Sequence, residues 1–317
     1  MTDTKSTSWT TRVEEYITYR RNLGFELEVE AGMLLQFAKF AEKKKQNRLT
    51  VVLATQWART SKNKTPITWG GRINILRGFA KYCQRFETDT EIPSRNLFGA
   101  TRRRLVPHIY TDAEVLALLA EAENLSPING LRPATCRTII GLLATDGLRI
   151  SEAVNLTRTD VDLAAGVITI REAKFHKSRL VPLHGTVTEA LSLYAQLRDR
   201  IVTKPNNEHF FLLDNGKPAN QRGILYAVRL LCKKLGWKPR GDYSHHRLHD
   251  LRHTFIVRST LSFYQQGIDI DRAVLALSTY VGHAKVADTY WYFTGIPELM
   301  GIAAERFHQY SQQGASL

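Results

Sequence analysis

The sequence predicts a mainly α-helical protein with a small β-sheet, an α+β fold, arranged in two domains. Apolar residues recur at helical spacing through most of the chain, and two short runs rich in β-branched residues are typical of paired strands. A length of 317 residues fits about two domains at the usual ~150 residues each. Hydrophobic residues make up 43% of the chain and charged residues 23%, which are ordinary values for a protein with a sizeable core and argue against global disorder.

The first third of the chain is predicted to be a helical domain, residues 1–92. Its apolar residues return at helical spacing, as in Val13, Tyr16 and Ile17. We expect about four helices in this domain, near residues 10–22, 27–45, 52–60 and 68–86.

Positive charge is concentrated in this part of the sequence. The chain has 44 Lys and Arg against 30 Asp and Glu, a net charge of +14. Residues 1–108 hold 20 of these cations and 10 of the acids, so they carry a surplus of 10, whereas the rest carries a surplus of 4. Such a surplus favours a polyanionic partner, most often nucleic acid, over a merely soluble basic protein. Two clusters are candidates for contact with a DNA backbone, or else for solvated faces: Lys43, Lys44 and Lys45, and Arg102, Arg103 and Arg104.

A linker and a second domain follow. Residues 93–108 contain Pro93, Gly99 and Pro107 without a clear period, as expected of a linker. The second domain, residues 109–317, opens with Thr111-Asp112-Ala113-Glu114, which has the form of a capping box at a helix start. We expect short strands at 167–171 and 179–183, and helices near 133–145, 186–202, 219–235, 248–264, 271–281 and 295–310.

Cysteine usage and hydropathy indicate a cytoplasmic protein. Cys83, Cys136 and Cys232 are far apart in sequence and form no C-x-x-C pair, so a disulfide framework or a cysteine-rich zinc site is not expected. The polar N-terminus has no apolar signal core, and no run approaches the ~18–20 apolar residues that span a bilayer. We therefore expect a soluble intracellular protein, associated with the nucleoid if its partner is DNA.

Two clusters in the second domain carry groups suited to phosphate. Arg149 begins a predicted helix, and Glu152 lies three residues later on the same face, where it can hold the guanidinium. Such a pair is most often only structural. The predicted hairpin turn carries Lys174, Lys177 and Arg179, which suits either an exposed charged turn or one that enters a DNA groove.

The segment His249-Asp250-Leu251-Arg252-His253 allows two interpretations. It is similar to the zinc-protease helix His-Glu-x-x-His, with Asp in place of Glu. Against zinc, Arg252 shares a helix face with His249 and would bring a fixed positive charge to the metal, and no third ligand is evident. A last cluster places His283 nine residues before Tyr292 in an aromatic stretch, which by itself also suits a core patch.

Taken together in chain order, these clusters resemble the tyrosine recombinase family of phage integrases and Xer and Cre-like enzymes. The matching stretches are 147–152, Lys174 with 177–183, 249–253, 281–283 and Tyr292. The six key positions follow one another at spacings of 25, 75, 3, 31 and 9 residues, and the resemblance covers roughly residues 109–310. Two departures stand out. The interval from Arg252 to His283 is long, with an apparent insertion at 264–271, and Tyr290 lies close to Tyr292, although the spacing of the family selects Tyr292.

The resemblance implies a catalytic set and a reaction. Its members would be Arg149, Lys174, His249, Arg252, His283 and Tyr292. The two arginines would clamp the phosphate, aided by His283. Tyr292 would attack it with help from His249, and Lys174 would protonate the leaving 5′ oxygen. Glu152 would orient Arg149, and the basic clusters together with Lys177 and Arg179 would bind DNA.

The resemblance also implies a 3′-phosphotyrosine intermediate, no nucleotide or metal cofactor, and a homotetramer that acts on two DNA duplexes. Residues 1–92 would be a core-binding domain. The segment 295–317 would dock onto a neighbouring subunit or pack on its own, through the apolar residues Ile302, Ala303 and Phe307. Two alternatives within this fold are a type IB-like topoisomerase and an inactive DNA-binding homologue.

Overall fold

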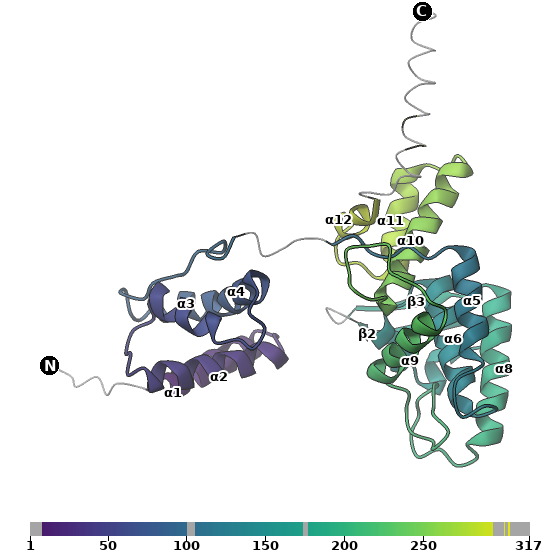
Figure 1. Ribbon diagram of the computed structural model, residues 1–317, viewed down its shortest axis with the longest axis horizontal. Coiled ribbons are helices and arrows are strands. Elements are labelled where there is room, and N and C mark those ends of the chain that lie inside the picture. The colour runs from purple at the N-terminus through teal and green to yellow at the C-terminus, as the bar shows by residue number, and fades with distance from the viewer. Residues whose placement is uncertain (1–7, 100–104, 174–176, 294–300, 302–303, 305–317) are drawn as a thin grey trace, which may run out of the picture. The chain divides into compact units, whose positions relative to one another are not determined.

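The computed structural model describes residues 8–99, 105–173 and 177–293, together with the single positions 301 and 304. The chain divides into two compact units, residues 1–104 and 105–317. Both units are mainly helical, and the described residues contain one three-stranded sheet, in the second unit (Figure 1). The predicted α+β fold is therefore confirmed.

The first unit contains the four predicted helices, with ends that differ from the expected ones by three residues at most. They are α1 (Trp9–Asn22), α2 (Glu28–Lys43), α3 (Val51–Arg59) and α4 (Pro66–Cys83). Three of them begin at a hydroxyl residue, Ser8, Thr50 or Thr65, whose side chain accepts a hydrogen bond from the first turn. These caps explain why the helices begin where they do.

Aromatic residues fill the core of the first unit. Phe37 of α2 meets Trp9 of α1 and Trp57 of α3 edge to face, with ring centroids 5.6 and 5.4 Å apart. Phe79 of α4 meets the ring of Tyr16 at 5.5 Å. Edge-to-face contact is the favoured geometry of such pairs, so one aromatic cluster joins all four helices.

The second unit is built around one buried helix. This helix, α6 (Leu131–Asp146), lies against α5 (Asp112–Ala122), α8 (Gly185–Ile201) and α10 (Leu248–Gln265). The remaining helices of this unit are α7 (Ile150–Val154), η1 (Arg158–Asp160), α9 (Gln221–Lys234), α11 (Ile270–Val281), α12 (Ala287–Tyr290) and η2 (Trp291–Phe293). Ten residues of α6 are buried, including the polar Thr135 and Asp146, so this helix contacts neighbours on most of its surface.

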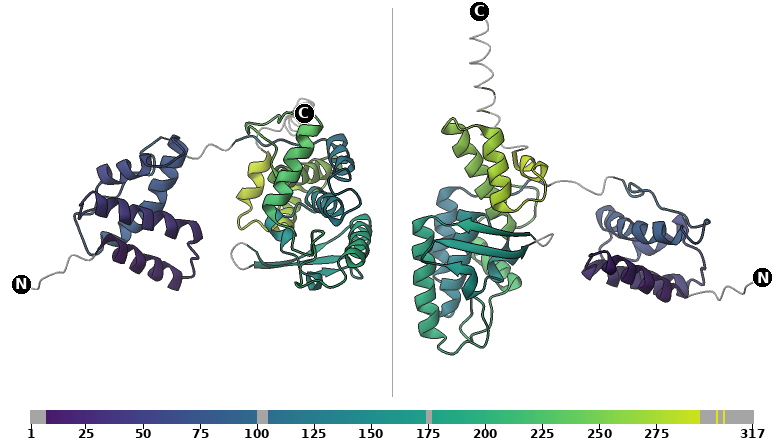
Figure 2. Two further views of the ribbon diagram at one scale, coloured as in Figure 1. Left: turned by 60° about the horizontal axis from the view of Figure 1, so that its bottom comes forward. Right: turned by 180° about the vertical axis from the view of Figure 1, so that it is seen from behind.

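The sheet is antiparallel and lies along one side of these helices (Figure 2). Its strands are β1 (Val161–Asp162), β2 (Val167–Ala173) and β3 (Lys177–Pro182), in that order. Ile168 pairs with Val181, and Ile170 pairs with Arg179. Side chains of paired residues share a face, and Ile168, Ile170 and Val181 are buried, so Arg179 lies on the core-facing side of the sheet.

Two details differ from the sequence-based expectation. The two-residue strand β1 was not predicted, because a strand that short has no periodicity to detect. The expected insertion at 264–271 forms no separate element. Those residues end α10, form a short turn with Gly267 at a φ of 68°, and begin α11. The predicted C-terminal helix near 295–310 lies outside the described residues.

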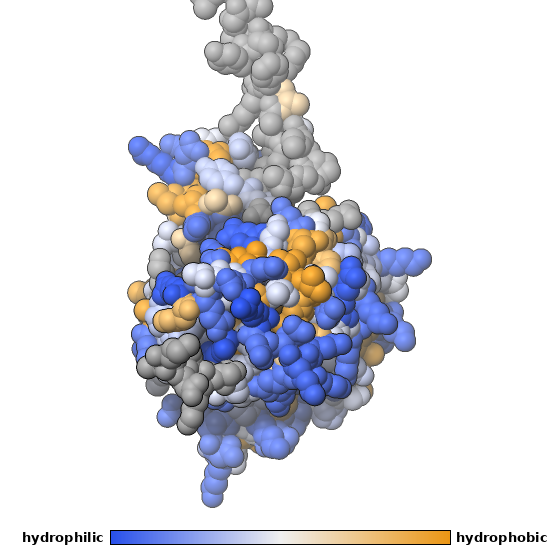
Figure 3. Space-filling view, turned by 90° about the vertical axis from the view of Figure 1, so that its left-hand side faces the viewer, coloured by the Kyte–Doolittle hydropathy of each residue, from blue (hydrophilic) through white to orange (hydrophobic). Residues whose placement is uncertain are grey.

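The surface shown in Figure 3 is mostly hydrophilic, with a smaller hydrophobic patch. In the described part of the chain, no helix has the length and apolar composition needed to span a membrane.

Candidate active site

Two left-handed glycines shape the place where the predicted catalytic residues meet. Gly147 ends α6 with a φ of 60°, and Gly282 ends α11 with a φ of 70°. A Cβ at Gly147 would lie 2.3 Å from Cδ1 of Phe255, so a larger residue would be excluded by contact as well as by backbone strain. Both helix ends therefore expose main-chain carbonyl groups at one spot.

Arg252 joins these two helix ends. It projects from α10 and is only 1% exposed. Its Nη1 donates to the Gly147 carbonyl at 2.6 Å, and its Nη2 donates to the Val281 carbonyl at 2.7 Å. Its Nε is buried and has no hydrogen-bond partner among the described residues. Burial and the charge of Arg149 lower the pKa of Arg252 to about 10, although the neighbouring Tyr292 and Glu152 oppose this shift. The side chain remains a cation at neutral pH.

Arg149 stands at the start of α7 and is held by Glu152. Its Nη1 donates to Glu152 Oε1 at 2.6 Å, and its backbone N–H donates to Oε2 at 2.9 Å. Its Nη2 donates to the Gly282 carbonyl at 2.8 Å. Burial alone would raise the pKa of Glu152, but hydrogen bonds and charge from Arg179 and Arg149 outweigh it and lower the pKa to about 2. Glu152 is therefore an ionised carboxylate.

Tyr292 lies beside Arg252. It is 8% exposed, and its ring lies between His253, at a centroid distance of 4.4 Å, and His283, at 5.4 Å. The side chains of the two neighbouring tyrosines lie in different environments. Tyr290 is 44% exposed, and its hydroxyl donates to Asp271 Oδ1 at 3.3 Å. Only Tyr292 is packed among the basic groups.

Two imidazoles, His253 and His283, contact Tyr292, and His249 packs against His253; burial favours the neutral form of all three. Burial, followed by the charges of nearby arginines, lowers the pKa of His249 to about 4 and that of His283 to about 3. Burial and the neighbouring His249 lower the pKa of His253 to about 2. His283 Nδ1 also lies 2.7 Å from Thr289 Oγ1, which fixes its ring. A neutral imidazole can accept a proton, as activation of a phenol requires.

The start of α10 is braced from several sides. Arg247 caps this helix with its backbone N–H on Asp250 Oδ2 at 3.1 Å and its Nε on Oδ1 at 3.0 Å.

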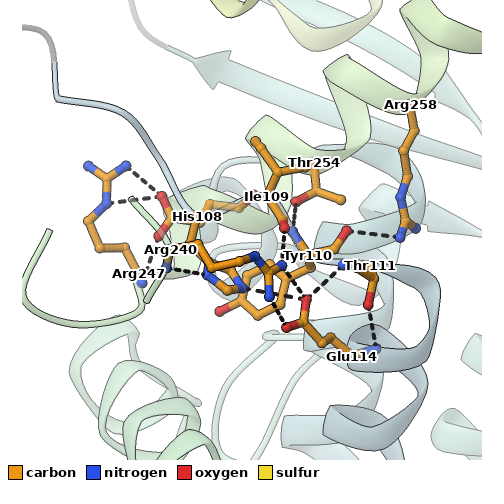
Figure 4. A network of polar contacts seen from close by, with 10 residues as sticks. His108, Ile109, Tyr110, Thr111, Glu114, Arg240, Arg247, Thr254 and Arg258 are labelled. Carbon is orange, nitrogen blue, oxygen red and sulfur yellow. Dashed lines mark hydrogen bonds and ion pairs between the residues drawn. The ribbon is translucent and has the colours of Figure 1, made fainter. Parts of the chain in front are cut away.

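The Tyr110 backbone N–H donates to Thr254 Oγ1 of α10 at 2.9 Å, and the Tyr110 carbonyl accepts from Arg258 of the same helix at 3.0 Å. Figure 4 shows this network, in which Arg240 also bonds to Glu114 and to the Ile109 carbonyl. The helix that carries His249 and Arg252 is thus held in place by contacts outside the cluster.

Arg179 has a different setting from the one the sequence suggested. We predicted that it would contact DNA. In the structure its guanidinium donates to both oxygens of Glu152 and to the Tyr280 carbonyl, and its side chain is 11% exposed. The family resemblance assigned no role to His253 or Thr289, and His253 was considered only in the zinc interpretation of residues 249–253. The spacing of His253 four residues after His249 was a usable signal, whereas nothing in the sequence singled out Thr289.

The other predicted residues do not join this cluster. Lys43, Lys44 and Lys45 are exposed at the end of α2, in the first unit. The described residues do not include Arg102, Arg103, Arg104 or Lys174, nor the side chain of Lys177. The structure thus brings together Arg149, Glu152, His249, Arg252, His283 and Tyr292, all from the second unit.

The second unit holds arginines, neutral histidines and a tyrosine in one cluster. Known proteins with similar sequences show the class to which this protein belongs. Residues 109–295 match the phage integrase family. The chain is 37% identical over 303 residues to the integrase/recombinase y4rB of Sinorhizobium fredii, covering 94% of this chain and 96% of that protein. It is 30% identical over 221 residues to the tyrosine recombinase XerD of Staphylococcus saprophyticus, covering 69% of each.

The chain belongs to the phage integrase family of tyrosine recombinases, and it is a site-specific DNA recombinase. Solved structures support the fold. The Tn1549 transposon integrase in complex with transposon right-end DNA has a TM-score of 0.66 at 17% identity, covering 95% of this chain and 100% of that one. The recombinase XerH bound to palindromic difH in a post-cleavage complex has a TM-score of 0.65 at 19% identity, covering 94% and 85%. The predicted family and enzyme class are confirmed.

Proposed function

We propose that Tyr292 cuts one DNA strand by attacking a phosphodiester and keeps the 3′ phosphate as a covalent phosphotyrosine. The observation that carries this proposal is the packing of Tyr292 against His283 and beside the buried Arg252 within one chain. A phosphodiester is anionic, so cleavage needs neutralised non-bridging oxygens, an activated nucleophile and a proton for the leaving oxygen. The cluster offers the first two of these.

Arg149 and Arg252 form the phosphate clamp in this proposal. Both guanidinium groups are held by carbonyl oxygens on one side, so their positions are set before the substrate binds. The unpartnered Nε of Arg252 is a donor that a non-bridging oxygen would satisfy. His283, with its ring fixed by Thr289, adds a further hydrogen bond.

Proton transfer falls to His249 and Lys174. A phenol with an ordinary pKa of about 10 is protonated at neutral pH and needs a base or a strong positive field. His249 is neutral and accepts the Tyr292 proton as the oxygen–phosphorus bond forms. The bond from phosphorus to the 5′ oxygen then breaks, and Lys174 supplies the proton for that oxygen. Attack by the 5′ hydroxyl of a second strand reverses these steps and reseals the DNA.

Recombination requires several copies and two duplexes. We propose a tetramer that exchanges strands in pairs, as part of a mobile element acting in the cytoplasm. The first unit would be the core-binding domain, with Lys43, Lys44 and Lys45 on the DNA backbone. Arg102–Arg104 and Lys177 would add backbone contacts. Such contacts give affinity rather than sequence choice.

A suicide substrate tests the covalent step. Purified protein is incubated with duplexes from its own flanking DNA that carry a nick near the cleavage site. The short fragment between the cleavage site and the nick is released with a free 5′ hydroxyl and diffuses away, so the adduct accumulates. We expect a protein–DNA adduct with wild type and none with Tyr292→Phe. Tyr290→Phe is the matched control and should form the adduct. An adduct that persists in Tyr292→Phe would refute the assignment.

The same material separates recombination from its alternatives. Joining of two different duplexes indicates recombination, whereas relaxation of supercoils without joining indicates a topoisomerase. DNA binding without an adduct in the wild type indicates an inactive homologue. Full activity in the presence of a chelator would exclude the zinc interpretation of residues 249–253.

A further inference from the structure

Three successive carbonyl groups at the end of α11 each accept a hydrogen bond from a different arginine. The last four carbonyls of an α-helix have no partner within the helix. Here the Ser278 and Thr279 carbonyls accept from the backbone N–H groups of His283 and Gly282, at 2.9 and 3.0 Å. The next three are bound by side chains: Tyr280 by Arg179 Nε at 2.8 Å, Val281 by Arg252 Nη2 at 2.7 Å, and Gly282 by Arg149 Nη2 at 2.8 Å.

This arrangement places three cations at the negative end of one helix. Carbonyl groups and the helix dipole offset the mutual repulsion of arginines that stand so close together. Two of the three arginines belong to the proposed phosphate clamp. The third, Arg179, comes from β3, and no role in the reaction follows from the family resemblance beyond DNA contact.

Each nitrogen of the Arg179 guanidinium donates a hydrogen bond within the protein, which uses three of its five N–H groups. Its Nη1 donates to Glu152 Oε1 at 3.0 Å and its Nη2 to Oε2 at 2.8 Å, while Nε binds the Tyr280 carbonyl. A bidentate pair of this kind fixes both partners in one plane. Each of the three nitrogens has an acceptor, and the side chain lies on the core-facing side of the sheet. The face of the guanidinium that could bind a phosphate through both Nη1 and Nη2 is occupied by the buried carboxylate of Glu152.

Glu152 couples Arg179 to Arg149. Its Oε1 accepts from both guanidinium groups, at 2.6 Å from Arg149 and 3.0 Å from Arg179. Its Oε2 accepts from Arg179 and from the Arg149 backbone N–H. If Arg179 were lost, Glu152 would remain buried with one cation instead of two, and two of the four hydrogen bonds that orient its carboxylate would be lost. Arg149 would then lose its fixed anchor.

Gly282 is part of the same contact. A Cβ at this position would lie 2.7 Å from Arg179 Nη1 and 2.9 Å from its Cζ, so the guanidinium packs directly on the glycine. The φ of 70° also disfavours any other residue. Arg179 therefore needs Gly282 next to it, and the turn that leads to His283 is held by Arg179.

We propose that Arg179 is a positioning residue for DNA cleavage, which sets Arg149 through Glu152 and ties β3 to the end of α11 without contacting DNA. This inference rests on the proposed covalent function. It replaces the prediction that Arg179 binds the DNA backbone. Lys174 lies five residues before Arg179 in the sequence.

The first experiment compares cleavage with binding. Single-turnover adduct formation and DNA affinity at several salt concentrations are measured for Arg179→Gln. We expect a cleavage rate lower on the order of 100-fold, as a small misplacement of a catalytic group can cause, with DNA affinity and its salt dependence unchanged. Loss of affinity with a salt slope smaller by about one unit would make Arg179 a DNA contact and overturn the proposal.

The control is a second arginine–carboxylate pair in the same sheet. Arg171 on β2 binds Asp160 at 2.5 Å, and its side chain is 63% exposed. Arg171→Gln removes a similar pair away from the cluster and should cleave at the wild-type rate. Equal losses in both variants would indicate that the sheet has been weakened in general, and would overturn a specific role for Arg179.

A neutral substrate tests whether the defect passes through the clamp. A methylphosphonate at the scissile position lacks one anionic oxygen, so cleavage depends less on Arg149. We expect the difference between wild type and Arg179→Gln to shrink on this substrate. A misfolded fraction would lower the rate on both substrates equally, and that result would overturn the proposal. Gly282→Ala, which pushes on the guanidinium from the other side, should show the same pattern if Arg179→Gln does not fold.

Different results would overturn the covalent function proposed for Tyr292 and the positioning role proposed for Arg179. Absence of an adduct with wild-type protein would overturn the proposed function and this inference together. A wild-type adduct that Tyr292→Phe abolishes, combined with a wild-type rate in Arg179→Gln, would overturn only the role of Arg179.

Discussion

The cations of the first unit and those of the second unit stand in opposite environments. Lys43, Lys44 and Lys45 are exposed at the end of α2, whereas Arg252 is buried and Arg149 is held by a carboxylate and a carbonyl group. Exposed charges act at a distance and are screened by salt, so they contribute affinity. Buried and oriented charges create a fixed field at one point, which stabilises a transition state. Net charge alone does not distinguish these two uses.

Removing a held arginine should have the largest effect. We expect Arg252→Ala to lower single-turnover cleavage by roughly 10²- to 10³-fold, the loss typical of one oriented donor to a developing negative charge, while DNA binding survives. Adduct formation and binding are measured on the same substrate. Arg258→Ala is a control on the same helix, because Arg258 bonds to Asp112 and the Tyr110 carbonyl instead. Parallel loss of binding and cleavage in Arg252→Ala would point to misfolding.

His283→Ala should be milder. It removes one hydrogen bond to the phosphate and one ring contact with Tyr292, so a loss of about tenfold in the cleavage rate is expected. The measurement is the rate of adduct formation at saturating DNA. A loss as large as that of Arg252→Ala would mean that His283 has another role, such as proton transfer.

The buried histidines should make the second unit sensitive to acid. The pKa of His253 is about 2 in the folded protein against an ordinary value of about 6.5, so below pH 6.5 the unfolded chain binds more protons. The stability that this group contributes is therefore present above pH 6.5 and lost as the pH falls, by about 2 kcal/mol at pH 5.

His253→Phe tests this dependence, because it keeps an aromatic ring and removes the titration. Urea unfolding at pH 7 and pH 5 should show a smaller loss of stability in the variant than in the wild type. A variant with the same pH dependence as the wild type would show that His253 is protonated as easily in the folded state as in the unfolded one.

A single exposed lysine should have the smallest effect. Lys44→Gln is expected to lower the slope of log affinity against log salt by about one unit and to leave cleavage at saturating DNA unchanged. Lys44→Arg keeps the charge and should keep the slope. An unchanged slope in Lys44→Gln would remove this residue from the DNA interface and weaken the contrast between the two units.

Most of the fold and the order of the catalytic positions could be predicted from the sequence. Hydrophobic periodicity located the helices of the first unit to within three residues. Arg149, Arg252, His283 and Tyr292 stood out because motif and spacing reinforced one another. The structure then placed their side chains together, although no position in the sequence could indicate which carbonyl groups would hold them.

The environment of the Arg179 side chain could not be predicted from the sequence. Its place in a basic hairpin suggested a partner outside the protein, because charge composition carries no information on which face of a strand a residue occupies. The register fixes that face: Arg179 pairs with Ile170, and Val181, two residues later, is buried. An inward-facing cation needs an anion within the fold, and that anion, Glu152, lies 27 residues earlier in the chain.

The packing of Tyr292 beside His283 and Arg252 of its own chain has a consequence for mixed assemblies. In the proposed tetramer each subunit would carry its own proposed nucleophile and cations, so two variants that lack different members of the set would not complement one another. A mixture of Tyr292→Phe and Arg252→Ala proteins would then remain inactive in DNA cleavage, because no single polypeptide in it has both Tyr292 and Arg252.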